Sequence, residues 1–249
     1  MYYGPKPLAQ LSAGLTLLHK TAATFTAAPA AASFKPVVQT ANQILFANYD
    51  MVQSEIRWIR NTTGYSPDKQ PVIDLFNNYF GGGMGAIVFQ TIRESKALAY
   101  STFASFVTPD KKEDPYFTVA YVGSQADKFN EAVVSMNELL NELPKLEQNL
   151  AFSKDGIKKD IETERITQDA IITNYLNNQR KGINYDMRKN IYTAVDKLTV
   201  NDVAAFHKQY IAGKPYTYCI VASDKKVSEE AMKKFGEVKK LSLEELFGF

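Results

Sequence analysis

The chain has 249 residues, of which 45% are hydrophobic and 22% are charged. This usage excludes a disordered, collagen-like or coiled-coil protein. Lysine and arginine number 29 against 27 aspartates and glutamates, a net charge of +2, so the charge balance does not point to nucleic acid or an anionic membrane as the main partner. The length favours one large domain, or one domain with an appendage, over two equal domains.

The first forty residues combine an apolar stripe with a segment rich in alanine and proline. Four leucines share one face of a predicted amphipathic helix: Leu8, Leu11, Leu15 and Leu18. We favour this helix over a secretory signal peptide because polar residues interrupt the apolar run. Residues 21–36 have no regular periodicity and predict a linker. We therefore divide the chain into an N-terminal helix and linker, residues 1–36, and a main body, residues 37–249.

The main body alternates pairs of strands with groups of helices. Stretches rich in β-branched and aromatic residues predict strands at 43–49, 51–59, 99–107, 116–122 and 216–221. Apolar residues at helical spacing predict helices at 71–80, from 84 onward, at 129–143, twice within 148–188, at 199–210 and at 228–235. Residues 199–202 predict a capping box, from Thr199 to Asp202, that begins the helix at 199–210. Residues 61–68 predict a turn, and Tyr175 is expected to face the core. This pattern favours an α+β fold over a regular alternation of strand and helix.

The residues that usually bind metal are scarce. The chain has two histidines, His19 and His207, and one cysteine, Cys219. Neither histidine has a glutamate or a second histidine at ligand spacing, so we predict no metal or cofactor site in this chain. We interpret both histidines as structural and Cys219 as a small buried residue on a strand.

A glycine cluster precedes one of the predicted helices, at Gly81, Gly82, Gly83 and Gly85. Such a loop can hold a phosphate through its backbone amides. The lysine that completes a nucleotide-binding loop is absent from this position. We therefore interpret the cluster as a tight turn between helices with close backbone packing.

The segment from residue 79 to 101 carries three motifs in order: Tyr-Phe-Gly-Gly-Gly-Met, Ile-Arg-Glu and Leu-Ala-Tyr-Ser. This segment resembles the insulinase-like (pitrilysin) zinc metallopeptidase family, and specifically its C-terminal half-domain, which binds no zinc. The strands and helices of the main body also follow the family's order. The resemblance implies an α+β domain with an antiparallel or mixed sheet and helices on one face. Family members commonly carry glycine where this chain has Ala97.

The family resembled here works as a clamshell of two related halves. The N-terminal half binds Zn²⁺ through a His-x-x-Glu-His helix, and the other half closes over an extended peptide substrate. Since this chain lacks the zinc motif, the resemblance implies that the chain alone is inactive. It also implies a zinc-bearing half-domain as partner, in the same polypeptide or in a separate subunit, within a bacterial zinc metalloendopeptidase.

Arg93 and Tyr100 match, in motif and spacing, an arginine and a tyrosine that the family's second half extends toward the substrate. The resemblance implies that both bind substrate, and that Tyr100 is catalytic as a donor to the oxyanion that develops when zinc-bound water attacks the peptide bond. The alternative is structural. An arginine near a helix end often caps carbonyls, and a tyrosine that begins a strand often belongs to the core.

Three functional hypotheses follow. The first is the substrate-clamping half of a zinc endopeptidase, with residues 1–36 as the tail of a preceding family domain in a longer protein. The second is a non-catalytic structural or assembly subunit, and the third is a stand-alone peptide-binding module with an exposed sheet edge. No membrane span is predicted, because glycines and amides interrupt the longest uncharged stretch, residues 75–92. The compartment, cytoplasm or periplasm, stays open.

Overall fold

A computed structural model describes residues 1–20, 22–30 and 35–248, without the side chains of residues 168 and 169. The elements in chain order are α1 (Leu8–Leu18), β1 (Gln43–Asn48), β2 (Gln53–Gly64), η1 (Pro67–Lys69), α2 (Gln70–Phe80), η2 (Phe89–Ser95), β3 (Ala99–Val107), β4 (Pro115–Gln125), η3 (Ala126–Lys128), α3 (Phe129–Asn141), α4 (Glu147–Thr163), α5 (Gln168–Arg180), α6 (Met187–Val195), α7 (Val200–Tyr210), β5 (Thr217–Ala222), α8 (Glu229–Lys233), β6 (Glu237–Lys240) and α9 (Leu243–Phe247).

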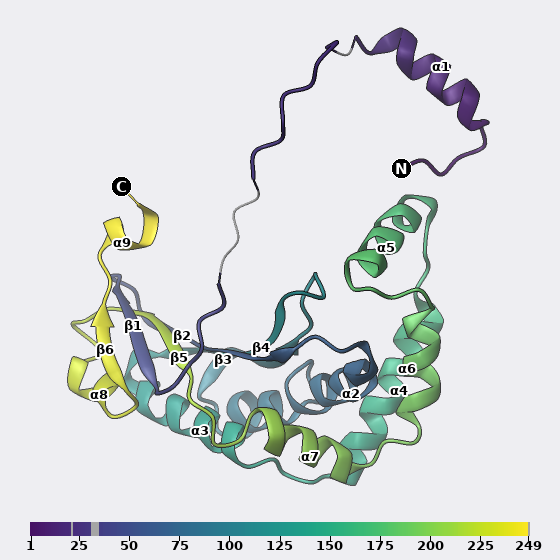
Figure 1. Cartoon of the computed structure of the whole chain (residues 1–249). Helices are drawn as coiled ribbons and strands as arrows, with labels where there is room; N and C mark the ends of the chain where they lie inside the picture. Colours follow the sequence, from purple (N-terminus) through teal and green to yellow (C-terminus); the bar gives the residue numbers. More distant parts are fainter. Residues whose placement is uncertain (21, 31–34, 249) are drawn as a thin grey trace.

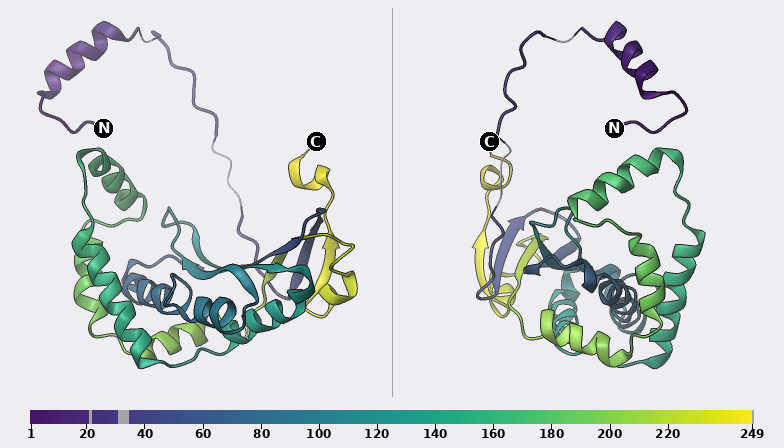
Figure 2. Two further views of the ribbon diagram at one scale, coloured as in Figure 1. Left: turned by 180° about the vertical axis from the view of Figure 1, so that it is seen from behind. Right: turned by 45° about the vertical axis from the view of Figure 1, so that its right-hand side comes forward.

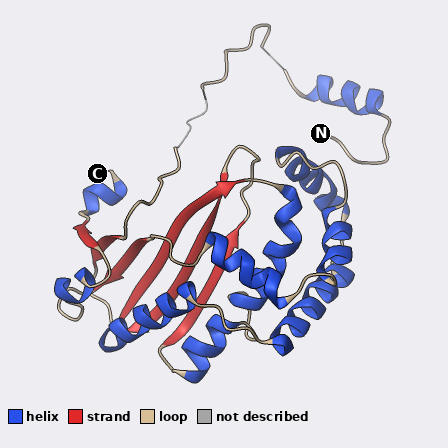
Figure 3. Cartoon of the chain, turned by 60° about the horizontal axis from the view of Figure 1, so that its bottom comes forward, coloured by secondary structure: helices blue, strands red, loops and turns tan. Residues whose placement is uncertain are grey.

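The centre of the molecule is one six-stranded sheet in the order β3-β4-β2-β5-β1-β6. β1 pairs in parallel with β5 and β6, whereas β2 pairs antiparallel with β4 and β5, and β3 antiparallel with β4. Helices α2, α3 and α7 lie along one face of this sheet (Figures 1 and 3). The α+β class with a mixed sheet is therefore confirmed.

The core lies between the sheet and these helices. Alternate residues of β2 point into it, so Ser54, Ile56 and Trp58 are buried while their neighbours are not. Helix α2 contributes Ile73 and Phe76, among others. The apolar side chains that recur every second residue on the strand and every three to four residues on the helix therefore pack together in one core.

A second group of helices lies at the end of the molecule that carries α2. Helices α4 and α6 pack against α2 and against each other. Helix α5 stands apart beyond them (Figures 1 and 2), and none of its described side chains is buried. Tyr175, which we expected to face the core, is 51% exposed. The prediction was wrong because the face of α5 toward the protein borders a cavity.

Other boundaries also differ from the sequence prediction. Residues 61–64 continue β2 through an irregular pairing with β4, although they predict a turn. The helix expected from Met84 begins at residue 87 and continues as a π-helix. The predicted capping box of α7 is present, with Thr199 and Asp202 bonded reciprocally. Cys219 lies on β5 as expected but is half-buried, and this burial raises the pKa of its thiol.

The N-terminal segment runs away from the sheet (Figure 1). Helix α1 forms where the leucine stripe predicts it, and it has no buried residue. Of the predicted linker, residues 21 and 31–34 lie outside the described residues, and the remainder forms neither helix nor strand. The division of the chain at residue 36 stays a prediction. Within the described part of the chain, no helix is long and apolar enough to cross a membrane.

Candidate functional site

The matched arginine lies on an irregular helix. Element η2 is a π-helix in which the N–H of Lys96 donates to the carbonyl of Thr91, five residues earlier, at 3.0 Å. Arg93 occupies its last turn. Single turns of π-helix are rare and often occur at functional sites, because the wider turn displaces side chains from their regular positions.

The turn that joins η2 to β3 is strained. Ala97 has a φ of 48° and is the one non-glycine residue with positive φ within the described ranges. A Cβ makes this left-handed conformation unfavourable, so glycine would adopt it here with less strain. Several hydrogen bonds hold the turn; among them, Leu98 N–H donates to the carbonyl of Ile92 at 2.9 Å, and Lys128 Nζ donates to the carbonyl of Ala97 at 3.0 Å.

The matched tyrosine lies at an irregularity of the sheet. Ala99 pairs with Ser124 and Ser101 pairs with Gly123, so Tyr100 is an extra residue on β3. Such a bulge bends the strand and turns one side chain away from its regular direction. Tyr100 is 77% exposed and is therefore not part of the core.

Arg93 and Tyr100 are brought together. The Cζ atom of Arg93 lies 5.1 Å from the centroid of the Tyr100 ring and 4.8 Å from that of Phe89, within range for cation–π contact. Arg93 Nε is 3.6 Å from a carboxylate oxygen of Glu94. A π-turn, a strained alanine and a bulge thus surround one exposed guanidinium–phenol stack.

The remaining chemically active residues do not join this site. The ring of His207 is buried against Phe76 and Phe80, its Nε2 lies 3.1 Å from the carbonyl of Leu139, and burial lowers its pKa. This is the packed, structural histidine that we predicted. His19 is exposed at the end of α1. In residues 1–20, 22–30 and 35–248, no group of three or more His, Cys, Asp or Glu side chains is placed to hold a metal ion.

The glycine cluster packs against the sheet as the sequence suggested. A Cβ on Gly81 would lie 2.1 Å from the carbonyl oxygen of Ala104 on β3. The N–H of Ala104 in turn donates to the carbonyl of Gly81 at 3.3 Å. Gly83 has a φ of 114°, which side chains rarely adopt. The cluster therefore positions the end of α2 directly beside the strand that carries Tyr100.

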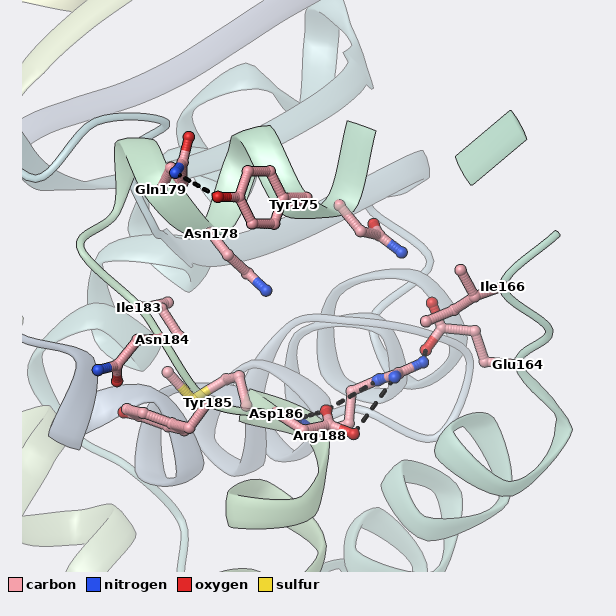
Figure 4. A pocket seen from close by; sticks show the side chains of 12 residues that line it. Glu164, Ile166, Tyr175, Asn178, Gln179, Ile183, Asn184, Tyr185, Asp186 and Arg188 are labelled. Atoms are coloured by element: carbon pink, nitrogen blue, oxygen red, sulfur yellow. Dashed lines mark hydrogen bonds and ion pairs between the residues drawn. The ribbon is translucent and has the colours of Figure 1, made fainter. Parts of the chain in front are cut away.

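Sequence reasoning missed a cavity of about 730 Å³ between α5 and the segments that connect it to α4 and α6. Its lining includes asparagines, two tyrosines and an ion-paired arginine, shown in Figure 4. The one signal in the sequence was the density of asparagine in the stretch Asn-Tyr-Leu-Asn-Asn from residue 174 to 178. Amides on a helix are usually solvated, so this signal is weak.

The comparisons with known proteins identify the family. The family model of the peptidase M16 inactive domain matches residues 16–153. Because this match spans more than half of the chain, the chain belongs to the peptidase M16 inactive domain family. A search of the curated proteins finds no match.

Solved structures share the fold. The peptidase M16 inactive domain from Pseudomonas fluorescens has a TM-score of 0.65 at 15% identity, over 79% of this chain and 47% of that one. A protease from Helicobacter pylori has a TM-score of 0.65 at 14% identity, over 86% and 52%. A chain of complex III2 from Candida albicans has a TM-score of 0.58 at 14% identity, over 89% and 54%. The chain thus spans about half the length of each of these structures.

Proposed function

We propose that this domain is the substrate-clamping, non-zinc half of a zinc-dependent endopeptidase of the insulinase type. Residues 37–249 form the clamping domain, and residues 1–36 connect it to a preceding domain. The observation that carries the proposal is the exposed stack of Arg93 on Tyr100, held by three consecutive irregularities of the backbone. Strained and irregular backbone persists where the surrounding structure compensates for it, and it clusters at functional sites.

Arg93 binds the peptide in this proposal. Its guanidinium has five N–H donors in a planar fork, and among the described residues it forms an ion pair with Glu94 alone, at 3.6 Å. The side chain is 38% exposed, so donors remain for a substrate carbonyl. The two aromatic rings beside it limit its rotation and orient the fork before substrate arrives.

Tyr100 supplies the donor to the developing oxyanion. Its hydroxyl is on an exposed ring, and the stack on Arg93 fixes the direction of that ring. A donor positioned in advance stabilises charge most effectively in a closed cavity from which water is excluded. Closure against the zinc-bearing half would provide that cavity. In this proposal, the His-x-x-Glu-His helix and its Zn²⁺ belong to that partner half.

The test is peptidase activity on a quenched peptide library, with this chain alone, with the zinc-bearing half added, and with variants of the pair. We expect activity in the mixture only, and a loss of about tenfold or more with Arg93→Ala or Tyr100→Phe. Tyr49→Phe is the matched control, since Tyr49 is also exposed, at 66%, and lies outside the site. Full activity of both pair variants would refute the assigned roles.

A structural or assembly subunit is the second candidate, and the similarity to a chain of complex III2 motivates it. In that case no zinc-bearing partner would produce activity, and the chain would instead co-purify in a stable complex. The stand-alone peptide-binding module is the third candidate. It has less support, because the edge of β3 is partly closed: the side chain of Asn77 bonds both the N–H and the carbonyl of Phe106.

A further inference from the structure

The cavity beside α5 has no place in the proposed clamping function. It lies between α5, the segment that ends α4, and the segment that leads into α6. Asn174, Tyr175 and Asn178 line it from one face of α5, and Tyr185 lines it from the connection to α6. A face of a helix turned toward the protein is usually apolar and packed. Here that face carries amides and leaves a cavity of about 730 Å³.

The asparagine amides of this face are free to bond a ligand. Asn174 and Asn178 are half-buried, and neither side chain has a hydrogen-bond partner among the described residues. Figure 4 shows Asn178 pointing from α5 into the space in front of Arg188. Each amide offers a carbonyl acceptor and an N–H donor at once. The pair therefore presents both kinds of hydrogen-bonding group to the cavity.

The charged residues of the cavity satisfy one another. Arg188 Nε donates to Asp186 at 3.1 Å, and Arg188 Nη1 lies 3.5 Å from a carboxylate oxygen of Glu164. The hydrogen bond from Arg188 holds the pKa of Asp186 below its usual range. An anionic ligand would have to displace these carboxylates from the guanidinium. The chemistry that remains free is neutral, and it suits a ligand with alternating donors and acceptors.

The spacing of the two amides matches one such ligand. Residues four apart on a helix are displaced by about 6.0 Å along its axis. In an extended peptide, groups that point to the same side repeat about every 6.6 Å. Asn174 and Asn178 are four apart and face the same cavity. Side-chain amides at this repeat can each bond one main-chain N–H and one main-chain carbonyl of an extended chain.

We infer that the cavity beside α5 binds an extended peptide segment through its main chain, with Asn174 and Asn178 as the bonding residues. Tyr175 is 51% exposed and Tyr185 is 41% exposed, so their rings can cover the peptide side chains. Recognition of the main chain makes this site tolerant of peptide sequence. The inference goes beyond the proposed clamping function and uses neither Arg93 nor the zinc-bearing half.

The test uses the full chain and a fluorescein-labelled peptide of alternating serine and valine, about ten residues long. Fluorescence anisotropy should show binding that weakens about thirtyfold with Asn174→Ala or Asn178→Ala and about a thousandfold with both, as expected for the loss of two and four neutral hydrogen bonds. Alanine favours helix over asparagine, so these variants should keep α5 folded. Asn177→Ala is the matched control: Asn177 is exposed on α5 and does not line the cavity.

A second probe separates main-chain from side-chain recognition. Two versions of the peptide carry methyl groups on alternate main-chain nitrogens, one version for each register, and we expect at least one of them to lose binding. The inference would be overturned if both methylated versions bound as tightly as the unmethylated peptide, or if Asn177→Ala weakened binding as much as Asn174→Ala and Asn178→Ala do. Displacement of the peptide by a neutral oligosaccharide, or no binding up to about 1 mM peptide, would also overturn it. If Arg93→Ala abolished binding and the asparagine variants did not, the peptide would occupy the clamping site instead.

Discussion

Replacing Ala97 with glycine should stabilise the protein. Ala97 has a φ of 48°, and the left-handed conformation costs an L-residue about 1–2 kcal/mol that glycine does not incur. Glycine also adds conformational entropy to the unfolded chain, and this effect cancels about 0.4–1 kcal/mol of the relieved strain. The net gain is about 0.5–1 kcal/mol, or about 1–4 °C in Tm for a chain of this size. The bond from Lys128 Nζ to the backbone carbonyl at this position is retained.

Urea unfolding and differential scanning calorimetry of Ala97→Gly measure this gain. The control is the same substitution at Ala205, which is exposed within helix α7. There, glycine should destabilise by about 1 kcal/mol, because it loses more backbone entropy on helix formation. Opposite signs at the two positions support the reasoning. A loss of stability at Ala97 comparable to the loss at Ala205 would refute it, because it would mean that this turn is not strained.

Two further predictions concern α2 and the loop that follows it. Gly81→Ala should destabilise the protein by about 3 kcal/mol or more in urea unfolding, because the new Cβ would lie 2.1 Å from a main-chain oxygen of β3. Gly85→Ala is the control and should change stability little, because its Cβ meets nothing within 4 Å. Equal effects of the two substitutions would contradict the close packing at Gly81. Burial raises the pKa of Asp74 to about 6, so between about pH 4 and pH 6 the folded state holds a proton that the unfolded state releases. The resulting contribution to the free energy of unfolding is full below about pH 4 and is lost as the pH rises through about 6. Asp74→Asn should remove this fall of about 3 kcal/mol in the free energy of unfolding, as measured by urea unfolding across this pH range. An unchanged pH profile in the variant would contradict the role of Asp74.

The elements that the sequence predicted well have strong local signals. The strand of residues 99–107 and the capping box at Thr199 depend on composition and spacing within a few residues, and both are present. Short elements at the C-terminal end, such as β6 (Glu237–Lys240), were not predicted. β6 is an edge strand of four charged or half-buried residues, and its pairing with β1 forms only once the sheet exists.

For the candidate site, too, the sequence identified the residues but not their arrangement. Motif and spacing identified Arg93 and Tyr100 as candidates, and family membership supports the comparison that led to them. The sequence could not predict that they stack at 5.1 Å. That contact requires a π-turn, a residue with positive φ and a bulge in succession. Each is a departure from regular periodicity, which sequence patterns do not encode.

The sequence alone thus determined the α+β class, the positions of most strands and helices, and the motifs that relate the chain to the M16 family, because these depend on local periodicity and residue type. Only the tertiary structure decided which face of α5 borders a cavity and how Arg93 meets Tyr100. Both depend on the packing of segments distant in sequence or on irregular backbone, and their energies are set by neighbours that no local pattern specifies.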